Sequence, residues 1–234
     1  MINKNKIKKH KATIRLHRKI VRKTCFKMGI PLQGLLHDLS KYSKEEMSIA
    51  KWYVGNRSPH AACRDALGYS SSWPHHYHKN KHHWQYWLDI EDWPDKVYPI
   101  KMPYKYIIEM FCDLIGAGKA YSKEKWTTSS PMEYYLNSCK GKRLMHPVSE
   151  NLLVALLTAI KEFPEEENFY KWYNNYLPNK FDDFDEALQK VFIDSDKTYG
   201  YRRMHIAMKS LGFNYNEKFV CNLSLDKTIL FSTS

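Results

Sequence analysis

The residues best suited to chemistry are an adjacent histidine and aspartate, His37 and Asp38, followed closely by Lys41. An imidazole nitrogen and a carboxylate oxygen can bind the same divalent cation, and a nearby ammonium group can neutralise an anionic substrate such as a phosphate. On their own, two adjacent polar residues more often form a helix end or a solvated helix face. The metal hypothesis therefore depends on further donors elsewhere in the chain.

The other candidate ligands lie in segments that are far apart in the sequence. They are His17, His75, His76, His82, His83 and Asp113. Together with the doublet they supply enough donors for one or two cations, and iron, manganese and zinc are all compatible with such mixed ligation. Glu109, one helical turn before Asp113, suits either the orientation of a ligand or general base catalysis. Which histidine of each adjacent pair faces a cation stays open.

Cations held in this way favour the hydrolysis of a phosphate ester. They lower the pKa of a bound water from about 15.7 towards about 7, which produces a hydroxide that can attack phosphorus. Lys41 or the basic N-terminal residues would hold the phosphate. We therefore expect a metal-dependent phosphohydrolase acting on a phosphate-containing small molecule such as a nucleotide. The alternatives are a structural cation without catalysis, or histidines that are simply hydrogen-bonded core residues.

The basic charge of the protein is concentrated at its N-terminus. Of the 37 Lys and Arg residues, eleven fall within residues 1–27, which contain no acid. The remaining chain therefore has 26 basic and 25 acidic residues, a net charge of +1. The N-terminal segment would attract nucleic acid, an acidic membrane surface or an anionic substrate, and charge alone does not choose among them.

Composition places the chain among soluble globular proteins. Hydrophobic residues make up 43% of it, enough to bury a core. The five cysteines show no Cys-x-x-Cys spacing, which argues against a disulfide framework and a structural zinc site. The longest apolar run, residues 152–160, is far shorter than the roughly 20 residues that cross a bilayer. We therefore expect a cytoplasmic protein with no membrane partner.

A helical pattern dominates the segment around the doublet. Apolar residues recur every seven positions over residues 7–28, which predicts an amphipathic first helix with His17 on its inward stripe. Pro31 suits the first turn of a second helix. Four leucines within residues 32–39 predict that this helix is short and apolar. We expect the His-Asp doublet to lie within this second helix.

The rest of the first 177 residues is also predicted to be helical, without a convincing strand. Helices are expected over residues 43–54, 75–88, 146–163 and 165–177, and others begin at Pro103 and Ser130. Residues 55–74 are rich in Gly, Asn, Ser and Pro and are predicted to form a long loop. The expected fold class is therefore all-α, a helical bundle over residues 1–177 whose core can house a metal site.

The order of the candidate ligands resembles the HD-type metal-dependent phosphohydrolases, an all-helical family named for its metal-binding doublet. The resemblance implies that four residues are metal ligands: His17, His37, Asp38 and Asp113. It also implies that the histidine pairs are further ligands or phosphate contacts. The segment HDLSK is similar to the HD-x-G-K segment of the cyclic-dinucleotide phosphodiesterase branch. Because Ser40 replaces the glycine and the Gly-Tyr-Pro signature is absent, hydrolysis of cyclic dinucleotides is not expected.

Residues 10–150 more closely resemble a family of bacterial and phage proteins whose function is unknown. The resemblance is carried by the blocks GLLHDLSKYS, GNRSP, HHYHKNKHHWQYW and MPYKYIIEMFCDLIGAGKAY, which are long and specific. No reaction follows from this resemblance, so the enzymatic hypothesis still depends on the candidate metal ligands.

Residues 181–234 have a different pattern, in which two short basic helices separated by Gly212 predict helix-turn-helix geometry. The candidate DNA contacts are Arg202, Arg203, Lys209 and Lys218. The segment YGYRRMHIAMKSLGFNYNEKFV is similar to the helix-turn-helix segment of one large family of insertion-sequence transposases. This implies a second candidate function, a DNA-binding protein of mobile-element origin. A small helical hairpin packed on the first domain is the alternative.

Overall fold

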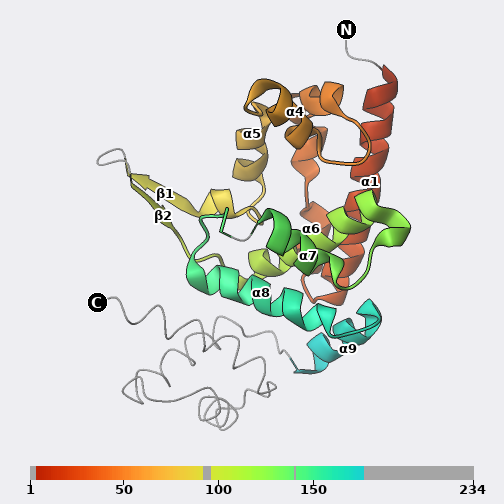
Figure 1. The fold of residues 1–234 in the computed structure, drawn as a ribbon, viewed down its shortest axis with the longest axis vertical. Helices are drawn as coiled ribbons and strands as arrows, with labels where there is room; N and C mark the ends of the chain where they lie inside the picture. The colour runs from red at the N-terminus through yellow and green to blue at the C-terminus, as the bar shows by residue number, and fades with distance from the viewer. Residues whose placement is uncertain (1–3, 92–95, 140, 177–234) are drawn as a thin grey trace.

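The computed structural model describes residues 4–91, 96–139 and 141–176 (Figure 1). Most of these residues are helical, and the only sheet among them is a two-stranded hairpin. The expected all-α class is therefore confirmed. In the described part of the chain, no helix combines the length and apolar character that crossing a bilayer requires. The predicted helix-turn-helix over residues 181–234, with its four candidate DNA contacts, lies outside the described residues.

The elements before the hairpin are one long helix and a series of short ones, in which η denotes a 3-10 helix. They are α1 Lys4–Lys27, α2 Pro31–Leu36, η1 Leu39–Tyr42, α3 Lys44–Met47, η2 Ser48–Trp52, α4 Pro59–Leu67, α5 Ser72–Lys79 and η3 Trp84–Trp87. The hairpin and the elements after it are β1 Leu88–Glu91, β2 Lys96–Pro99, α6 Tyr104–Ser122, η4 Lys123–Lys125, α7 Ser130–Ser138, α8 Pro147–Lys161 and α9 Glu166–Tyr176.

Several predicted elements are wrong in the middle of the chain. The helix predicted over residues 75–88 ends at Lys79, because Asn80 has an extended backbone, and the two histidines that follow lie in a turn. The predicted loop over residues 55–74 contains α4, and the helix predicted over 43–54 is divided into α3 and η2. Strands β1 and β2 pair antiparallel where no strand was expected. Such short elements are stabilised mainly by their neighbours and leave little local signal.

The core is built around α6, which packs against α1 on one side and α8 on the other. One cluster of fully buried side chains joins these helices, including Phe111 and Ile115 of α6, Val21 of α1 and Leu156 of α8. Close packing of this kind leaves little freedom for α1, α6 or α8 to shift. Because α1 and α6 both carry candidate metal ligands, their packing determines the distance between those ligands.

Two glycines allow other helices to approach α1 closely. At Gly116 of α6, an added Cβ would lie 2.3 Å from Val21 Cγ2 and 3.4 Å from His17 Nδ1. At Gly34 of α2, an added Cβ would lie 2.7 Å from Cys25 Cβ. Neither position has room for a side chain, so α6 and α2 can contact α1 in this way only because these residues are glycines.

We expect Gly116→Ala to lower the free energy of unfolding by about 1–3 kcal/mol, the usual cost of overpacking a core. The added methyl group forces Val21 to move or α1 and α6 to separate. The double variant Gly116→Ala/Val21→Ala lacks the clashing methyl group of Val21. Its loss of unfolding free energy should therefore be smaller than the sum of the losses in Gly116→Ala and Val21→Ala. Urea unfolding followed by circular dichroism measures all four proteins. An unchanged midpoint for Gly116→Ala would contradict the close approach.

Candidate metal centre

The His37–Asp38 doublet lies in a turn between two helical segments and not within a helix, as had been expected. Helix α2 ends at Leu36, and Asp38 has a left-handed backbone with φ 54° and ψ 27°. Among the described residues, Asp38 is the only non-glycine with a positive φ. Aspartate tolerates this conformation better than most residues, and such strained backbone is concentrated at functional sites. Both side chains of the doublet are buried, each residue being 1% exposed.

Arg18 of α1 holds this turn in place. Its Nε donates a hydrogen bond to the backbone oxygen of His37 at 2.8 Å, and its Nη2 donates to the oxygen of Leu35 at 3.2 Å. The last carbonyls of a helix have no partner within that helix. Arg18 satisfies one of them, at Leu35, and also the carbonyl of His37 just beyond the helix, so the doublet is attached to the helix that also carries His17.

A first set of donors, here named group 1, comes from α1, the turn and α6. Its members are His17, His37, Asp38 and Asp113. His17 Nε2 lies 3.2 Å from His37 Nε2, 3.4 Å from Asp38 Oδ2 and 3.1 Å from Asp113 Oδ1. His37 Nε2 lies 3.3 Å from each of the same two oxygens. Ligands about 2.1 Å from one cation lie about 3.0–3.4 Å from one another, so group 1 has the spacing of a coordination shell.

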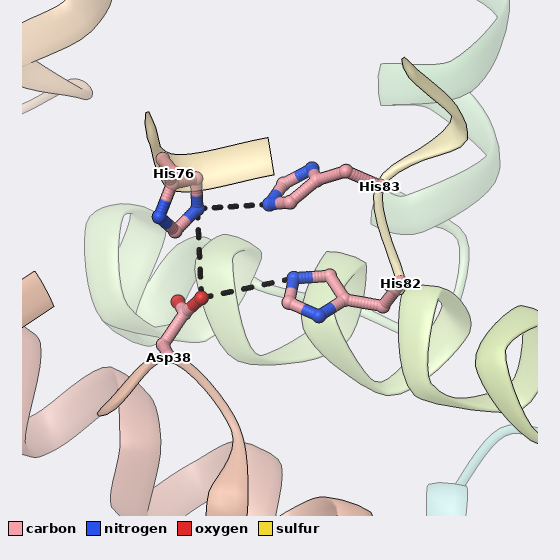
Figure 2. Close-up of side chains that lie close together, drawn as sticks. All are labelled: Asp38, His76, His82 and His83. Carbon is pink, nitrogen blue, oxygen red and sulfur yellow. Dashed lines mark hydrogen bonds and ion pairs between the residues drawn. The ribbon is translucent and has the colours of Figure 1, made fainter. Parts of the chain in front are cut away.

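A second set of donors, here named group 2, meets the other oxygen of Asp38 (Figure 2). Asp38 Oδ1 lies 3.5 Å from His76 Nε2 and 3.7 Å from His82 Nε2. His83 Nε2 completes the group, 2.8 Å from His76 Nε2. Each oxygen of the Asp38 carboxylate therefore faces a different group. A carboxylate in this position can be shared by two cations, as in two-metal sites.

Glu109 of α6 lies behind a ligand of each group. Its Oε1 is 3.0 Å from His37 Nδ1 and 3.0 Å from His82 Nδ1. A carboxylate on Nδ1 of a histidine fixes the tautomer and the ring orientation, leaving Nε2 available to a metal. These contacts suit the orientation of ligands, the first of the two roles that the sequence left open for Glu109.

The adjacent histidines of α5 share one glutamate but face different surroundings. Glu46 Oε1 lies 2.9 Å from His75 Nδ1, and its Oε2 lies 2.7 Å from His76 Nδ1. His76 then directs Nε2 towards Asp38, whereas His75 Nε2 lies 3.5 Å from Glu45. Of the eight predicted ligands, seven belong to group 1 or group 2, and His75 belongs to neither.

Sequence reasoning missed two residues that position the ligands. Glu46 was interpreted only as part of a capping box, and its backbone N–H does donate to Ser43 Oγ at 3.2 Å. Its side chain nevertheless turns to α5. Asn80 ends α5 and donates from Nδ2 to Ser40 Oγ at 2.7 Å and to the backbone oxygen of His76 at 2.7 Å. The sequence placed Asn80 inside a helix over residues 75–88, so no local signal marked it as a helix end.

The centre contains buried polar atoms that lack well-directed hydrogen bonds. Asp38 Oδ1 and His82 Nε2, which lie 3.7 Å apart, are in this state. Burying such atoms without partners is costly, and native proteins seldom leave them so. Coordination of a cation would satisfy them. The described residues of the centre therefore fit a bound metal ion.

Opposite charges in the centre shift one another's pKa values. Burial opposes ionisation of Asp38, but His37 and Lys41 outweigh it and hold the pKa of this carboxyl well below its usual range. Burial likewise disfavours a charged His37, yet Asp38 and Asp113 raise its pKa well above the ordinary value. Burial lowers the pKa of His83 well below its usual range, so this ring is neutral, as a metal ligand must be. A cation entering group 1 must displace the proton of His37.

Lys41 lies at the edge of the centre that solvent reaches. Its Nζ is 2.6 Å from Asp38 Oδ2, and its side chain is 25% exposed. The side chain of Asp113 is similarly accessible, at 22%. Burial lowers the pKa of Lys41, but Asp38 and Asp113 outweigh this and raise it above its ordinary value. An anion approaching from solvent would therefore meet a positive charge beside the donor groups.

We expect His76→Gln to remove the cation of group 2, while the matched variant His75→Gln keeps it. Both substitutions preserve size and alter a contact with Glu46, but only His76 directs Nε2 to Asp38. Elemental analysis of tag-free protein after metal reconstitution measures the difference. Equal metal content in the two variants would contradict the assignment of group 2.

We expect Glu109→Gln to weaken metal binding about 10- to 100-fold, the usual effect of losing an outer-shell carboxylate. Both His37 and His82 lose a charged partner, so cations in both groups should be affected. Titration against a chelator gives the affinities. Glu45→Gln is the control, because Glu45 is exposed and its carboxylate lies against His75, which belongs to neither group. If the two variants bind metal equally well, Glu109 does not position the ligands.

One comparison with known proteins gives a match, and two do not. Neither the curated proteins nor the solved structures give a significant match to this chain. The likenesses to HD-type phosphohydrolases and to insertion-sequence transposases therefore receive no support from them. A family model matches residues 6–159, a range that includes every member of groups 1 and 2. The chain belongs to the family of unknown function DUF5662, as its sequence blocks had indicated.

Proposed function

We propose that this protein is a metal-dependent phosphohydrolase that acts on a phosphate ester, such as a nucleotide. The observation that carries the proposal is the carboxylate of Asp38, with Oδ2 in group 1 and Oδ1 in group 2. Two cations sharing a carboxylate are a common arrangement for displacement at phosphorus. Iron, manganese and zinc all suit the mixed histidine and carboxylate donors.

When bound, such cations lower the pKa of a coordinated water towards about 7 and stabilise charge on the phosphoryl oxygens. The chain's own residues would hold the cations and orient the histidine ligands. Asp38 and the histidines provide the donors, and Glu109 and Glu46 keep the rings of three of them turned inward. Lys41 provides the positive charge that draws the phosphate to the exposed edge of the centre.

The exposed edge favours catalysis over a purely structural cation. Structural metal sites are usually closed by a full set of protein ligands. Here Lys41 and Asp113 are both partly exposed. A lysine repels a cation and cannot serve as its ligand while protonated, but it attracts an anionic substrate. Its position beside Asp38 therefore supports a centre that binds phosphate.

We expect the metal-reconstituted full chain to hydrolyse at least one of three probes: p-nitrophenyl phosphate, bis(p-nitrophenyl) phosphate or a nucleoside monophosphate. Lys41→Met should raise KM about 10- to 100-fold, which corresponds to the loss of one charged hydrogen bond. Lys44→Met, an exposed lysine three residues further on, is the matched control and should leave KM unchanged. Asp38→Asn should abolish the reaction.

Phosphate release or nitrophenolate absorbance reports the rates, and circular dichroism confirms that each variant is folded. A protein that is loaded with metal yet hydrolyses none of the three probes would overturn the proposed function. Equal activity of Lys41→Met and Lys44→Met would instead remove Lys41 from phosphate binding.

A further inference from the structure

Helix α2 turns its apolar side away from the protein. Gly34 faces α1, and helical geometry places Leu32 and Leu36 on the opposite side and Leu35 between the two sides. The exposed fractions are 61% for Leu32, 47% for Leu35, 56% for Leu36 and 48% for Leu39, the first residue of η1. We name these four residues the leucine face. Single exposed leucines are ordinary, but a cluster of them on one short segment marks an interaction surface.

The surroundings of the leucine face are basic. Residues 1–37 contain no Asp or Glu. Helix α2 crosses α1 beside Arg22, whose Cα lies 3.1 Å from the position of a Cβ at Gly34. Arg22 is exposed, as are Arg15 and Lys19 on the same helix, and Phe26 adds an aromatic ring that is 53% exposed. Exposed basic residues of α1 therefore flank the helix that carries the leucine face.

This combination decides among possible occupants. A second copy of the chain would bring two basic α1 helices together, and like charges repel. Nucleic acid offers phosphates to the basic residues but little apolar surface to the leucines. An anionic bilayer offers both, with headgroups for the Lys and Arg side chains and acyl chains for the leucines. The structure therefore points to a docking surface for anionic phospholipid membranes.

The end of α2 suits such an environment. The hydrocarbon core of a bilayer offers no hydrogen-bond partners, so backbone groups that reach it must be satisfied within the protein. The carbonyl of Leu35 in the last turn of α2 and that of His37 just beyond the helix already accept hydrogen bonds from Arg18. The sequence had suggested no membrane partner because it lacks a spanning segment, but a helix that lies on a bilayer surface needs none.

Sedimentation of the full chain with lipid vesicles tests the proposal. We expect binding to vesicles made of equal parts phosphatidylcholine and phosphatidylglycerol, weaker binding as salt is raised, and little binding to phosphatidylcholine alone. Leu32→Ser/Leu36→Ser should lower the vesicle affinity about tenfold or more, because the favourable transfer of each leucine side chain from water into the bilayer is lost. The matched control is Leu136→Ser/Leu144→Ser, two leucines of similar exposure elsewhere on the protein, and it should bind like the parent.

Three results would overturn the proposal. One is no binding of the parent protein to the anionic vesicles. Another is equal binding by the leucine variant and the parent, which would assign the binding to basic residues alone, including any outside the described part. The third is self-association of the parent that the leucine variant abolishes, without vesicle binding, which would make this surface an interface between copies. Circular dichroism and metal content verify that the variants are folded.

Discussion

The buried carboxylate of Asp38 is the constraint on which the rest of the centre depends. A charge removed from water is costly unless other charges or hydrogen bonds compensate for it. Here histidines lie against each oxygen and Lys41 lies against one of them. Compensation on both sides requires that α1, α5 and the turn after α5 all converge on a single residue. Each of these segments is therefore fixed by what Asp38 needs around it.

The scaffold meets this requirement through close helix packing. Gly116 lets α6 reach α1 at the level of His17, and Gly34 lets α2 deliver the doublet to the same helix. Arg18 then secures the strained backbone of Asp38 through the carbonyl before it. Glu109 extends the order further, because one oxygen orients a histidine from each donor group. Core packing and ligand geometry are thus linked, and a shift of α6 would disturb both.

Helix α2 has two different sides with two different consequences. Its inner side ends at His37 and supplies the metal centre, while its outer side carries the leucine face. The proposed hydrolase activity and the proposed membrane surface are separate inferences, since one depends on buried donors and the other on exposed side chains. If both hold, a phosphate-handling centre lies within a few residues of a lipid surface. The metal content and the vesicle affinity can be altered independently.

The sequence by itself determined the all-α class and the first long helix, and it indicated His17, His37, Asp38 and Asp113 as candidate ligands, which the structure brings together. Helical periodicity and ligand chemistry are local properties, so they can be recognised without a structure. Only the tertiary structure decided that His76 and not His75 meets Asp38, because adjacent residues on α5 are separated by what packs against them. The tertiary structure also decided that the side chain of Glu46 turns to α5 and that the leucines of α2 are exposed. It likewise decided that a turn and a hairpin follow α5. Each depends on contacts between segments far apart in the chain, and no local pattern specifies those.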